Sequence, residues 1–487
     1  MYLSKSKYCN AIQCPKILWL DKNKPQEKED ISNQSVLDNG TEVGIIAKDL
    51  FGPHIDIEFS TDLQKMINET NKALEKDNII ITEASFSYNN NFCSIDILKK
   101  NNNNYEIYEV KSSTEVKDIY LDDISYQTYV LKKLGHNITK TCIVYINSDY
   151  ERDGDLDLNK LFIIKDVTDI SLSKQKEVEE KINYINDYMK TKEEPKDDIG
   201  IHCVTPYNCP FFKYCTKQLP ANNIFNIKGM RSSTKFDLYH KGLYDYKDLL
   251  DEDINWKYKE QIEYSLYDKA PFINKNKIKD FLSTLSYPLY FLDFETYQQS
   301  IPQYDGIKPY MQIPFQYSLH YLEKENSKLM HKEFLASSGI DPRRTLAESL
   351  IKDIPKDTCV LAYNMMFEKM VIKNLANLYP DLTEHLMNIY YNIKDLMIPF
   401  KDRDYYTKEM DGSYSIKYVL PALFPNDPSL DYHNLDQVHN GQEAMSTYAN
   451  LNNLSKKEQE EVRNNLLKYC ELDTYAMVKI YKKLKEL

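Results

Sequence analysis

The stretch Tyr287-Pro-Leu-Tyr-Phe-Leu-Asp-Phe-Glu-Thr-Tyr297 is apolar and aromatic except for two carboxylates in its second half. This composition is typical of a buried β-strand. Asp293 and Glu295 are two residues apart, so on a strand both side chains point to one face, about 7 Å apart along the chain. Two acids on one buried face repel each other and lose hydration unless a cation lies between them. The alternative is an edge strand whose acids face water.

Length and composition bound the remaining interpretations. A chain of 487 residues exceeds what one hydrophobic core usually supports, which predicts two or three domains. No apolar run is long enough to span a bilayer and residues 1–11 contain no apolar signal segment, so we expect a cytoplasmic protein with no membrane partner. Nine cysteines in such a chain are expected to be thiols or metal ligands. The net charge of −12 argues against a charge-driven nucleic-acid binder but not against a nuclease that holds divalent cations.

The first half of the chain predicts three strands, a helix and a further strand. The three strands are expected at 78–88, 92–99 and 105–111, the helix at 121–134, and a strand buried on both faces at 141–146. A hairpin turn in the Asn-rich segment joins the second and third strands. This alternation of helices and strands predicts the α/β class.

Polar residues interrupt this apolar pattern at defined places. Asp96 lies in the second strand, and Glu109 and Lys111 flank Val110 on one face at the end of the third. An acid on each of two adjacent strands can hold Mg²⁺ or Mn²⁺ through oxygen ligands. Lys111 could orient an attacking water or stabilise charge developing on phosphate, and Gln127 on the next helix could face the same site. The alternative is a surface ion pair at a strand end.

Over about residues 1–220, this chain resembles the PD-(D/E)xK nucleases of the RecB type. The resemblance lies in the ordered set Asp96, Glu109, Lys111 and Gln127. The resemblance implies a restriction-endonuclease-like core with a metal-dependent nuclease site. Two positions depart from the family pattern. The segment Gly40-Thr-Glu-Val-Gly44 lacks the metal-binding His of many relatives, and Leu131 stands where a Tyr is usual, with Tyr129 close by. These departures predict weaker metal binding or turnover.

Three cysteines fall within the thirteen residues from Cys203 to Cys215, without the paired C-x2-C knuckles of a zinc ribbon. In RecB-type nucleases of the AddB and CRISPR-adaptation kinds, one N-terminal cysteine and three clustered cysteines hold a four-iron–four-sulfur (4Fe-4S) cluster that closes the domain. The matching residues here are Cys14, Cys203, Cys209 and Cys215. Cys9 competes with Cys14 for the first position, and Cys14 is preferred because a basic and aromatic stretch follows it. The alternative is four unliganded thiols.

The other cysteines and the middle of the chain carry weaker signals. Apolar surroundings predict core thiols for Cys93, Cys142, Cys359 and Cys470. Residues 221–285 are expected to form a helical connector. Within it, residues 236–250 predict a helix, a turn at Gly242 and a second helix, a spacing loosely similar to helix–hairpin–helix units whose turn amides contact phosphate. A plain helical connector is the preferred interpretation.

Two further acids lie on predicted helices of the C-terminal region. Glu368 falls in the first turn of the helix that follows the strand predicted at 358–363, where the helix dipole favours an acid. Tyr469 and Asp473 are four residues apart on the last helix, predicted at 455–485, and therefore share one face. Asp473 lies beside the packing side of that helix, where an unpaired carboxylate is costly.

The motifs Asp293-x-Glu295, Asn364-x2-Phe367-Glu368 and Tyr469-x3-Asp473 resemble the three exonuclease motifs of the DEDD superfamily, tyrosine subgroup, over about residues 286–487. The resemblance implies a ribonuclease-H-like fold and a two-metal 3′–5′ exonuclease. Asp293 would bridge two ions, Glu295 and Asp473 would hold the ion bearing the nucleophilic water, and Glu368 would support the site. Position 368 is Glu where Asp is usual, which leaves the metal preference open.

The same resemblance assigns residues to the substrate. Tyr469 would orient the nucleophilic water, Asn364 and Phe367 would line the 3′-terminal nucleotide, and Thr296 could touch the terminal sugar. Asp395 ranks lower as a substrate-facing or supporting residue, because it could equally cap a helix.

The whole layout resembles a bacterial family of unknown function that combines a RecB-like domain, a four-cysteine clasp and a DEDD-like domain. The leading hypothesis is a metal-dependent nuclease that contains a 4Fe-4S cluster and Mg²⁺ or Mn²⁺. It would remove nucleotides from the 3′ ends of single-stranded or end-containing DNA and carry a second, RecB-like site. Two alternatives remain: an RNA 3′ exonuclease with only the C-terminal site active, or a nucleic-acid-binding scaffold with inactive sites. Six acids at motif positions argue against the scaffold, because such costly carboxylates are usually lost with catalysis.

Overall fold

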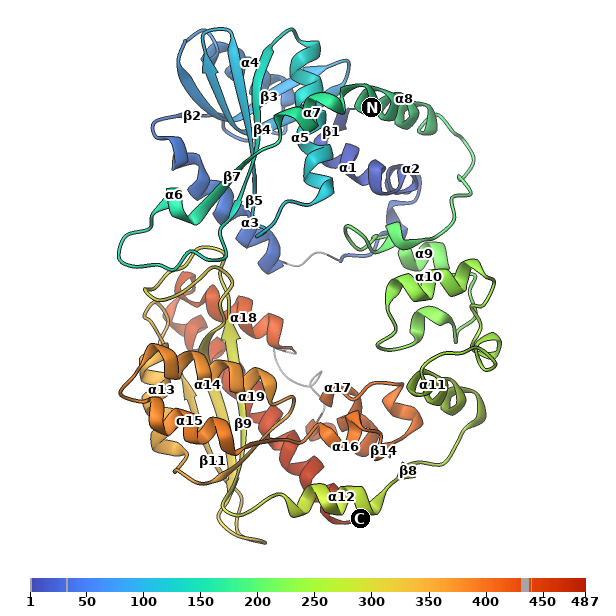
Figure 1. The fold of residues 1–487 in the computed structure, drawn as a ribbon, viewed down its shortest axis with the longest axis vertical. Helices are drawn as coiled ribbons and strands as arrows, with labels where there is room; N and C mark the ends of the chain where they lie inside the picture. The colour runs from blue at the N-terminus through green and yellow to red at the C-terminus, as the bar shows by residue number, and fades with distance from the viewer. Residues whose placement is uncertain (1, 32–33, 431–437, 439) are drawn as a thin grey trace. The chain divides into compact units, whose positions relative to one another are not determined.

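The computed structural model describes residues 2–31, 34–430, 438 and 440–487 (Figure 1). In this part of the chain, seven strands form one mixed sheet, five form a second, and two form a short ribbon. Helices accompany both large sheets, so the predicted α/β class is confirmed. Within the described residues, we find no helix with the length and apolar character needed to cross a membrane.

The chain divides into two compact units. Unit 1 comprises residues 1–219 together with 299–310, and unit 2 comprises residues 220–298 and 311–487. The break after residue 219 lies next to the predicted domain boundary at 220. Each unit contains one of the two large sheets and one of the predicted clusters of acids.

The sheet of unit 1 has the strand order β2-β3-β4-β5-β6-β7, with β1 paired to β4. Its strands are β1 (Leu3–Ser4), β2 (Ile55–Asp56), β3 (Ile79–Tyr88), β4 (Asn91–Asn101), β5 (Asn104–Lys111), β6 (Asn137–Ile146) and β7 (Phe162–Asp166). The β3–β4 and β4–β5 pairs are antiparallel and turn at Asn89, Asn90 and Asn102, which adopt the positive φ that Asn tolerates. Because β5 and β6 are parallel, a crossover must join them, and α5 (Asp118–Lys133) provides it.

Further helices accompany α5 in unit 1. They are α1 (Lys5–Gln13), α2 (Pro15–Asn23), α3 (Gln34–Ala47), α4 (Leu63–Ala73), α6 (Leu158–Leu161), α7 (Thr168–Ser173), α8 (Gln175–Tyr188) and α9 (Phe212–Thr216). One side of α5 contacts β3, β4 and β6, and other sides contact α1, α7 and α8. Most of α5 is therefore buried, including its polar residues Asp123 and Gln127.

The sheet of unit 2 has the order β11-β10-β9-β12-β13, with β9 at its centre. Its strands are β9 (Leu289–Tyr297), β10 (Ile313–Leu322), β11 (Met330–Leu335), β12 (Cys359–Ala362) and β13 (Ile393–Asp395). β10 runs antiparallel to β9 and β11, and β12 runs parallel to β9 and β13. Side chains of β9 alternate between two cores: Phe291 packs in the core that includes α19 (Lys456–Lys485), and Leu292 and Phe294 pack in the opposite core.

Three helices supply the opposite core of unit 2: α13 (Arg343–Asp353), α14 (Met366–Leu378) and α15 (Thr383–Asn392). The remaining helices are α10 (Ser232–His240), α11 (Trp256–Tyr267), α12 (Lys275–Ser283), α16 (Ile398–Lys401), α17 (Ile416–Leu423) and α18 (Gly441–Ala449). The predicted capping box starts α19, where Ser455 and Glu458 satisfy each other's backbone amides. This long helix, red in Figure 1, contacts β9, β10 and β11 along its sheet.

Residues 221–285, which we predicted to form a helical connector, belong to unit 2. The strand β8 (Phe272–Ile273) pairs with β14 (Tyr405–Tyr406), and Ile278 of α12 is buried in the core shared with α19. The predicted helix–turn–helix is also different, because α10 and the Gly242 turn are followed by a short 3₁₀ turn at Tyr246–Leu249. Apolar residues of this region are buried partly among themselves, in a cluster that includes Ile224, Leu249 and Ile262, and partly in the core shared with α19.

Residues 299–310 interrupt the predicted C-terminal domain, because they belong to unit 1. This segment leaves β9 directly after the acid-bearing strand and returns at β10. The Arg152 guanidinium donates to the Pro302 carbonyl at 2.8 Å, and the Arg152 carbonyl accepts from Gly306 N at 2.8 Å. The Tyr310 hydroxyl donates to the Ser112 carbonyl. Residues of unit 1 thus satisfy the hydrogen-bonding backbone groups of this loop. A prediction that divides the chain into consecutive domains does not reveal this exchange.

Candidate active sites

The four acids predicted for the C-terminal site come from three elements of unit 2. Asp293 and Glu295 lie on the α19 face of β9, Glu368 lies in the first turn of α14, and Asp473 lies on α19. Glu295 and Glu368 are only 7% and 2% exposed. The alternation of β9, the start of α14 and the last helix therefore bring the predicted acids into one partly buried cluster.

The electrostatics of this cluster disfavour bare carboxylates. Burial raises the pKa of Asp293 well above its ordinary value, and repulsion from Asp473 and Glu295 raises it further. Burial and Asp473 also raise the pKa of Glu295 well above its ordinary value, although Lys417 acts in the opposite direction. Burial raises the pKa of Glu368 to about 8. An added cation would remove both causes, because it would pair the charges and replace the lost hydration.

The donor set fits a divalent cation. The Oε2 atom of Glu368 is buried without a hydrogen-bond partner, a costly arrangement for a carboxylate. Asp293 and Glu295 each place one oxygen within 4.8 Å of the other and of the Cys470 sulfur. The two carboxylate oxygens of this group are ligands of the kind that Mg²⁺ and Mn²⁺ prefer.

Cys470 is a neighbour of the cluster that sequence reasoning placed only in the core. Its Sγ atom lies 3.8 Å from Asp293 Oδ2 and 3.9 Å from the Asp293 carbonyl oxygen. Burial, followed by repulsion from Asp293, raises the pKa of Cys470 well above its ordinary value, so the sulfur stays a thiol and a weak donor. The sequence signal that could have placed Cys470 at the cluster is its position directly after Tyr469 on the helix.

Asn364 and Asp395 shape the loop that leads into α14. Asn364 is exposed and adopts φ of 71°, and its backbone N–H donates to Asp395 Oδ1 at 3.0 Å. The same carboxylate oxygen accepts from Met397 N at 3.0 Å. Asp395 therefore fixes the backbone turns at Asn364 and Met397, which agrees with its alternative interpretation as a cap. The Asn364 side chain is left at the surface.

The other predicted substrate residues differ in accessibility. Tyr469 on α19 is buried, at 4% exposure. Phe367 is half-buried against the core of α13, α14 and α15. The Thr296 hydroxyl donates to Gln312 Oε1 at 2.7 Å, and strand alternation directs it away from the face of Asp293 and Glu295. Contact between Thr296 and a sugar would require this hydrogen bond to break.

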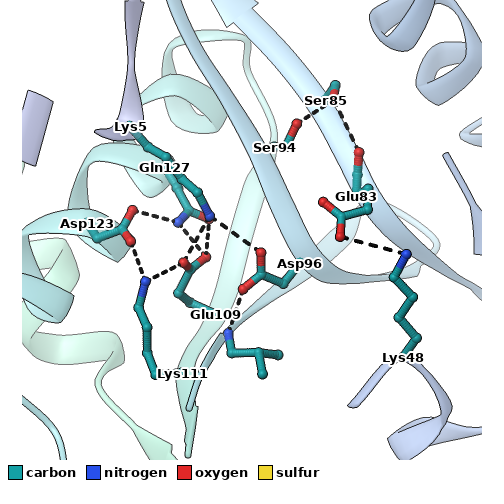
Figure 2. Close-up of polar contacts among 11 residues, drawn as sticks. Lys5, Lys48, Glu83, Ser85, Ser94, Asp96, Glu109, Lys111, Asp123 and Gln127 are labelled. Carbon is teal, nitrogen blue, oxygen red and sulfur yellow. Dashed lines mark hydrogen bonds and ion pairs between the residues drawn. The ribbon is translucent and has the colours of Figure 1, made fainter. Parts of the chain in front are cut away.

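The residues predicted for the N-terminal site lie in unit 1, in a dense hydrogen-bonded network around Glu109 (Figure 2). Glu109 is 1% exposed. Its Oε1 atom accepts from Lys111 Nζ at 2.7 Å, and its Oε2 atom accepts from Gln127 Nε2 at 2.7 Å. β5 and the crossover helix α5 thus bring the three predicted residues together.

Lys5 occupies the position between the two acids of this site. Its Nζ atom lies 2.9 Å from Glu109 Oε1 and 3.4 Å from Asp96 Oδ1, as Figure 2 shows. Asp96 Oδ2 accepts from the Val110 backbone N–H at 2.7 Å. The acids that were predicted to share a metal ion therefore share an ammonium group.

Asp123 and Lys5 are the two members of this network that the sequence analysis missed. Asp123 accepts from Lys111 Nζ at 2.7 Å and from Gln127 Nε2 at 3.0 Å. Asp123 is four residues before Gln127 on one helical face, so helical spacing could have found it. Lys5 carries no local signal, because its partners are 91 and 104 positions away.

The two lysines are firmly charged in this environment. Burial acts to lower their pKa values, but the Coulomb attraction of Asp96 and Glu109 raises the pKa of Lys5 well above its ordinary value. Glu109 and Asp123 do the same for Lys111. The network borders a cavity of about 960 Å³, large enough for a substantial ligand.

The four cysteines predicted to form a clasp line one narrow cavity in unit 1: Cys14, Cys203, Cys209 and Cys215. Burial raises the pKa of Cys203 to about 11 and that of Cys209 to about 12, and the neighbouring thiols of the set contribute. Free thiols held together in this way would be deprotonated only by an electrophilic partner such as a metal.

The structure separates Cys14 from its competitor Cys9. Cys9 borders the cavity of the Lys5–Glu109 network, where burial and Asp123 raise its pKa. Cys14 instead follows α1 and shares the cavity of the other three cysteines. Of the predicted core thiols, Cys93, Cys142 and Cys359 are buried.

Comparisons with known proteins add no activity. A model of the domain of unknown function DUF2779 matches residues 290–415, a segment that includes Asp293, Glu295 and Glu368 but ends before Asp473. The chain is similar to the uncharacterized protein MG366 of Mycoplasma genitalium, with 23% identity over 455 residues, 80% of this chain and 67% of that protein.

Two further relatives match over a smaller share. The MG366 homolog of Mycoplasma pneumoniae is 28% identical over 229 residues, 44% of this chain, and the uncharacterized protein UU173 of Ureaplasma parvum is 25% identical over 261 residues, 50% of this chain. These matches span only 34% and 37% of the two relatives.

Proposed function

We propose that this chain is a metal-dependent nuclease whose hydrolytic site is the carboxylate cluster of unit 2. The observation that carries the proposal is the set Asp293, Glu295, Glu368 and Asp473, in which burial and repulsion from Asp473 and Glu368 raise the pKa values of Asp293 and Glu295. A mixed sheet with the acid-bearing strand β9 at its centre is compatible with the ribonuclease-H-like fold that the motif resemblance implies. DNA with a free 3′ end is the substrate that this resemblance favours.

Asp293, Glu295, Asp473 and Glu368 would hold Mg²⁺ or Mn²⁺. When bound, the ions would supply Lewis acidity for the attacking and leaving oxygens of phosphodiester hydrolysis. The protein's own contribution is a rigid, water-poor frame: β9 fixes two carboxylates on one face and α19 fixes the third. The orphan oxygen of Glu368 leaves an acceptor for an ion or its water.

Neighbouring residues would orient water and substrate. Tyr469 lies one helical turn before Asp473 and is buried, so its ring is held in place by packing. Asn364 is exposed on the loop before α14, where it could meet a terminal nucleotide. Phe367 presents a partly exposed ring on the same helix for stacking against a base.

Unit 1 would serve the same substrate in another way. Lys5 and Lys111 already neutralise much of the charge of Asp96, Glu109 and Asp123. This charge balance favours a site that grips nucleic acid over a second site that cuts it. A RecB-like cleavage at this site would require Lys5 to move away from Asp96 and Glu109.

The four-cysteine cavity would hold a 4Fe-4S cluster that ties the N-terminal helices to the end of unit 1. A tetrahedral zinc site brings its sulfur atoms to about 3.8 Å from one another. Groups of three ligand atoms within 4.8 Å occur, among the described residues, only in unit 2, so no three of the four sulfur atoms lie within that distance of one another. Thiolate donors at this wider spacing suit an iron–sulfur cluster.

The test of the nuclease is cleavage of 3′- and 5′-end-labelled single- and double-stranded DNA and RNA with Mg²⁺ or Mn²⁺. We expect 3′-end shortening of DNA by the wild type and a loss of about 1,000-fold or more in Asp293→Asn. Glu384→Gln is the matched control, because this exposed acid of unit 2 pairs only with Lys356 at the surface. Lys111→Met separates gripping from cutting, since a grip alone raises KM more than it lowers kcat.

The outcomes distinguish the alternatives. Shortening of RNA but not DNA would identify an RNA 3′ exonuclease. Binding of nucleic acid without cleavage in any metal would favour the scaffold, and cleavage that survives Asp293→Asn would contradict the assigned site. For the cluster, we expect anaerobically purified protein to be brown and to contain iron, with Cys209→Ser bleached. A colourless wild type that contains zinc would contradict the 4Fe-4S assignment.

A further inference from the structure

Unit 2 contains a second group of metal-ligating side chains beside the carboxylate cluster. His320 of β10, His331 of β11 and Glu471 of α19 each place one ligand atom within 4.8 Å of the others. The two histidines are directly opposite in the antiparallel pair of strands, and their ring centroids lie 4.4 Å apart. Like-charged imidazolium rings at this distance would repel each other, so the arrangement favours uncharged rings.

A chain of hydroxyl groups orients both rings. Ser318 Oγ lies 2.9 Å from His331 Nε2 and 2.7 Å from Thr474 Oγ1, and Thr474 Oγ1 lies 2.8 Å from His320 Nδ1. The Thr474 hydroxyl donates to the backbone carbonyl of Glu471 at 3.1 Å. Its two lone pairs can then accept from the Ser318 hydroxyl and from His320 Nδ1–H.

This assignment fixes the tautomers. Since Ser318 donates to Thr474, its oxygen accepts from His331 Nε2–H, and every donor in the chain has one acceptor. The lone pairs left over are on His320 Nε2 and on His331 Nδ1, and the latter lies 3.9 Å from Glu471 Oε1. Hydrogen bonds to the far nitrogen are the usual means by which proteins aim a histidine at a metal.

We propose that His320, His331 and Glu471 form a binding site for a transition-metal ion of the zinc type, distinct from the carboxylate cluster. Two neutral imidazoles and a carboxylate are suited to Zn²⁺ and its neighbours in the first transition row, whereas Mg²⁺ prefers oxygen donors. Three protein ligands leave a fourth position for water or a substrate group.

Accessibility of the three residues fits exchange of an ion with solvent. His320 is 4% exposed, whereas the side chains of His331 and Glu471 are 23% and 50% exposed. The buried ring anchors the site and the exposed carboxylate forms its entrance. An ordinary surface ion pair between His331 and Glu471 is the competing explanation, and it predicts no metal affinity.

The site lies close to the proposed hydrolytic centre. Ser318 is directly opposite Asp293 in the β9–β10 register, and Glu471 follows Cys470 on α19. The hydroxyl chain therefore runs along the same face of the sheet as the acids. An ion held by the two histidines would help to fix α19, and with it Asp473, against β10 and β11.

The experiment titrates Co²⁺, and then Zn²⁺ in competition, into chelator-treated protein in excess Mg²⁺. The Cys209→Ser background removes the thiol site. We expect about one equivalent of Co²⁺ with visible d–d bands and no thiolate charge-transfer band, displaced by Zn²⁺. Glu471→Gln and His331→Ala should each weaken Co²⁺ binding tenfold or more, and Ser318→Ala by about 10- to 100-fold. His385→Ala is the control, because His385 contacts only the Ile354 carbonyl in its hydrogen bond.

Two comparisons distinguish loss of the metal site from misfolding of a variant. Glu471 is half exposed, so Glu471→Gln keeps the fold, and its loss of affinity is measured again in the chain with all cysteines. Asp293→Asn should bind Co²⁺ as the wild type does. The proposal is overturned if no Co²⁺ band forms in the Cys209→Ser background, if the band survives Glu471→Gln, or if it depends on Asp293. None of these results depends on nuclease activity, so failure of the proposed function is a separate outcome.

Discussion

The two acidic sites of this protein share one feature, two polar residues on one face of a strand. The charges of their carboxylates are neutralised in different ways. In unit 1, Glu109 and Lys111 share one face of β5, and Lys5 lies between Glu109 and Asp96. In unit 2, Asp293 and Glu295 share one face of β9, and burial and repulsion from neighbouring acids, Asp473 foremost, raise their pKa values. One site is balanced by its own side chains, and the other is left in need of a cation.

This difference distinguishes a site whose carboxylates are already paired with ammonium groups from a site whose carboxylates require a metal ion. A buried carboxylate beside an ammonium group already has its counter-charge, and a divalent ion must displace that group to bind. A buried carboxylate beside other carboxylates is unstable until an ion arrives. Similar strand motifs can therefore support opposite responses to charge removal.

Removal of an ammonium group from unit 1 should destabilise the protein strongly. Lys111→Met leaves Glu109 and Asp123 as buried acids without this partner, at a cost of about 3 kcal/mol in the free energy of unfolding. Urea unfolding measures the loss. The matched control is Lys133→Met, whose exposed pair with Glu179 should be worth less than about 1 kcal/mol. Equal effects of the two substitutions would contradict the charge balance of unit 1.

The metal-free stability of unit 2 should fall as the pH rises. Glu368 has a folded-state pKa of about 8 against an ordinary value of 4.5, so between these values the folded chain holds a proton that the unfolded chain has released. The free energy of unfolding should therefore fall with increasing pH by up to about 1.4 kcal/mol per pH unit for this group, and the dependence ends above pH 8.

Urea titrations in chelator between pH 5 and 9 measure this slope, to which Asp293 and Glu295 add with the same sign. Glu368→Gln should flatten it, whereas Glu384→Gln, an exposed acid paired with Lys356, should not. Saturating Mg²⁺ should reverse the trend, because metal binds the ionised carboxylates. A stability that rises with pH in chelator would contradict the raised pKa values.

The smallest expected effect is that two matched Asp→Asn substitutions change the free energy of unfolding in opposite directions. Without metal and at a pH high enough to ionise the cluster, Asp293→Asn removes one repelling charge and should stabilise the protein by about 1 kcal/mol, or about 2–4 °C in Tm. Asp96→Asn should destabilise it, because Asp96 accepts from the Val110 N–H and pairs with Lys5. Calorimetry checks both. Destabilisation by Asp293→Asn in chelator would show that the acids of unit 2 already have their counter-charge.

Sequence periodicity could predict the elements on which both sites depend. Alternation on β9 placed Asp293 and Glu295 on one face, and an Asn-rich turn placed the β4–β5 hairpin that brings Asp96 near Glu109. The capping pair Ser455 and Glu458 marked the start of α19. These signals are local, since they arise within one strand, one turn or one helix end.

What the sequence could not predict is long-range. Lys5 reaches acids about a hundred positions away, and no spacing rule connects them. Residues 299–310 join unit 1 through contacts such as those of Arg152 with Pro302 and Gly306, and residues 221–285 join unit 2 through partners such as β14. The pairing of His320 with His331 required the register of β10 and β11. Such contacts follow from tertiary packing and leave no periodic trace.

The most direct test of the account is Mn²⁺ binding, followed by electron paramagnetic resonance in a Glu471→Gln background that removes the histidine site. The account predicts two Mn²⁺ ions in unit 2. Binding should be lost in Asp293→Asn and retained in Asp96→Asn, while Lys5→Met should add an ion in unit 1. Retention of Mn²⁺ in Asp293→Asn together with its loss in Asp96→Asn would contradict the account, because it would place the metal among the lysines of unit 1.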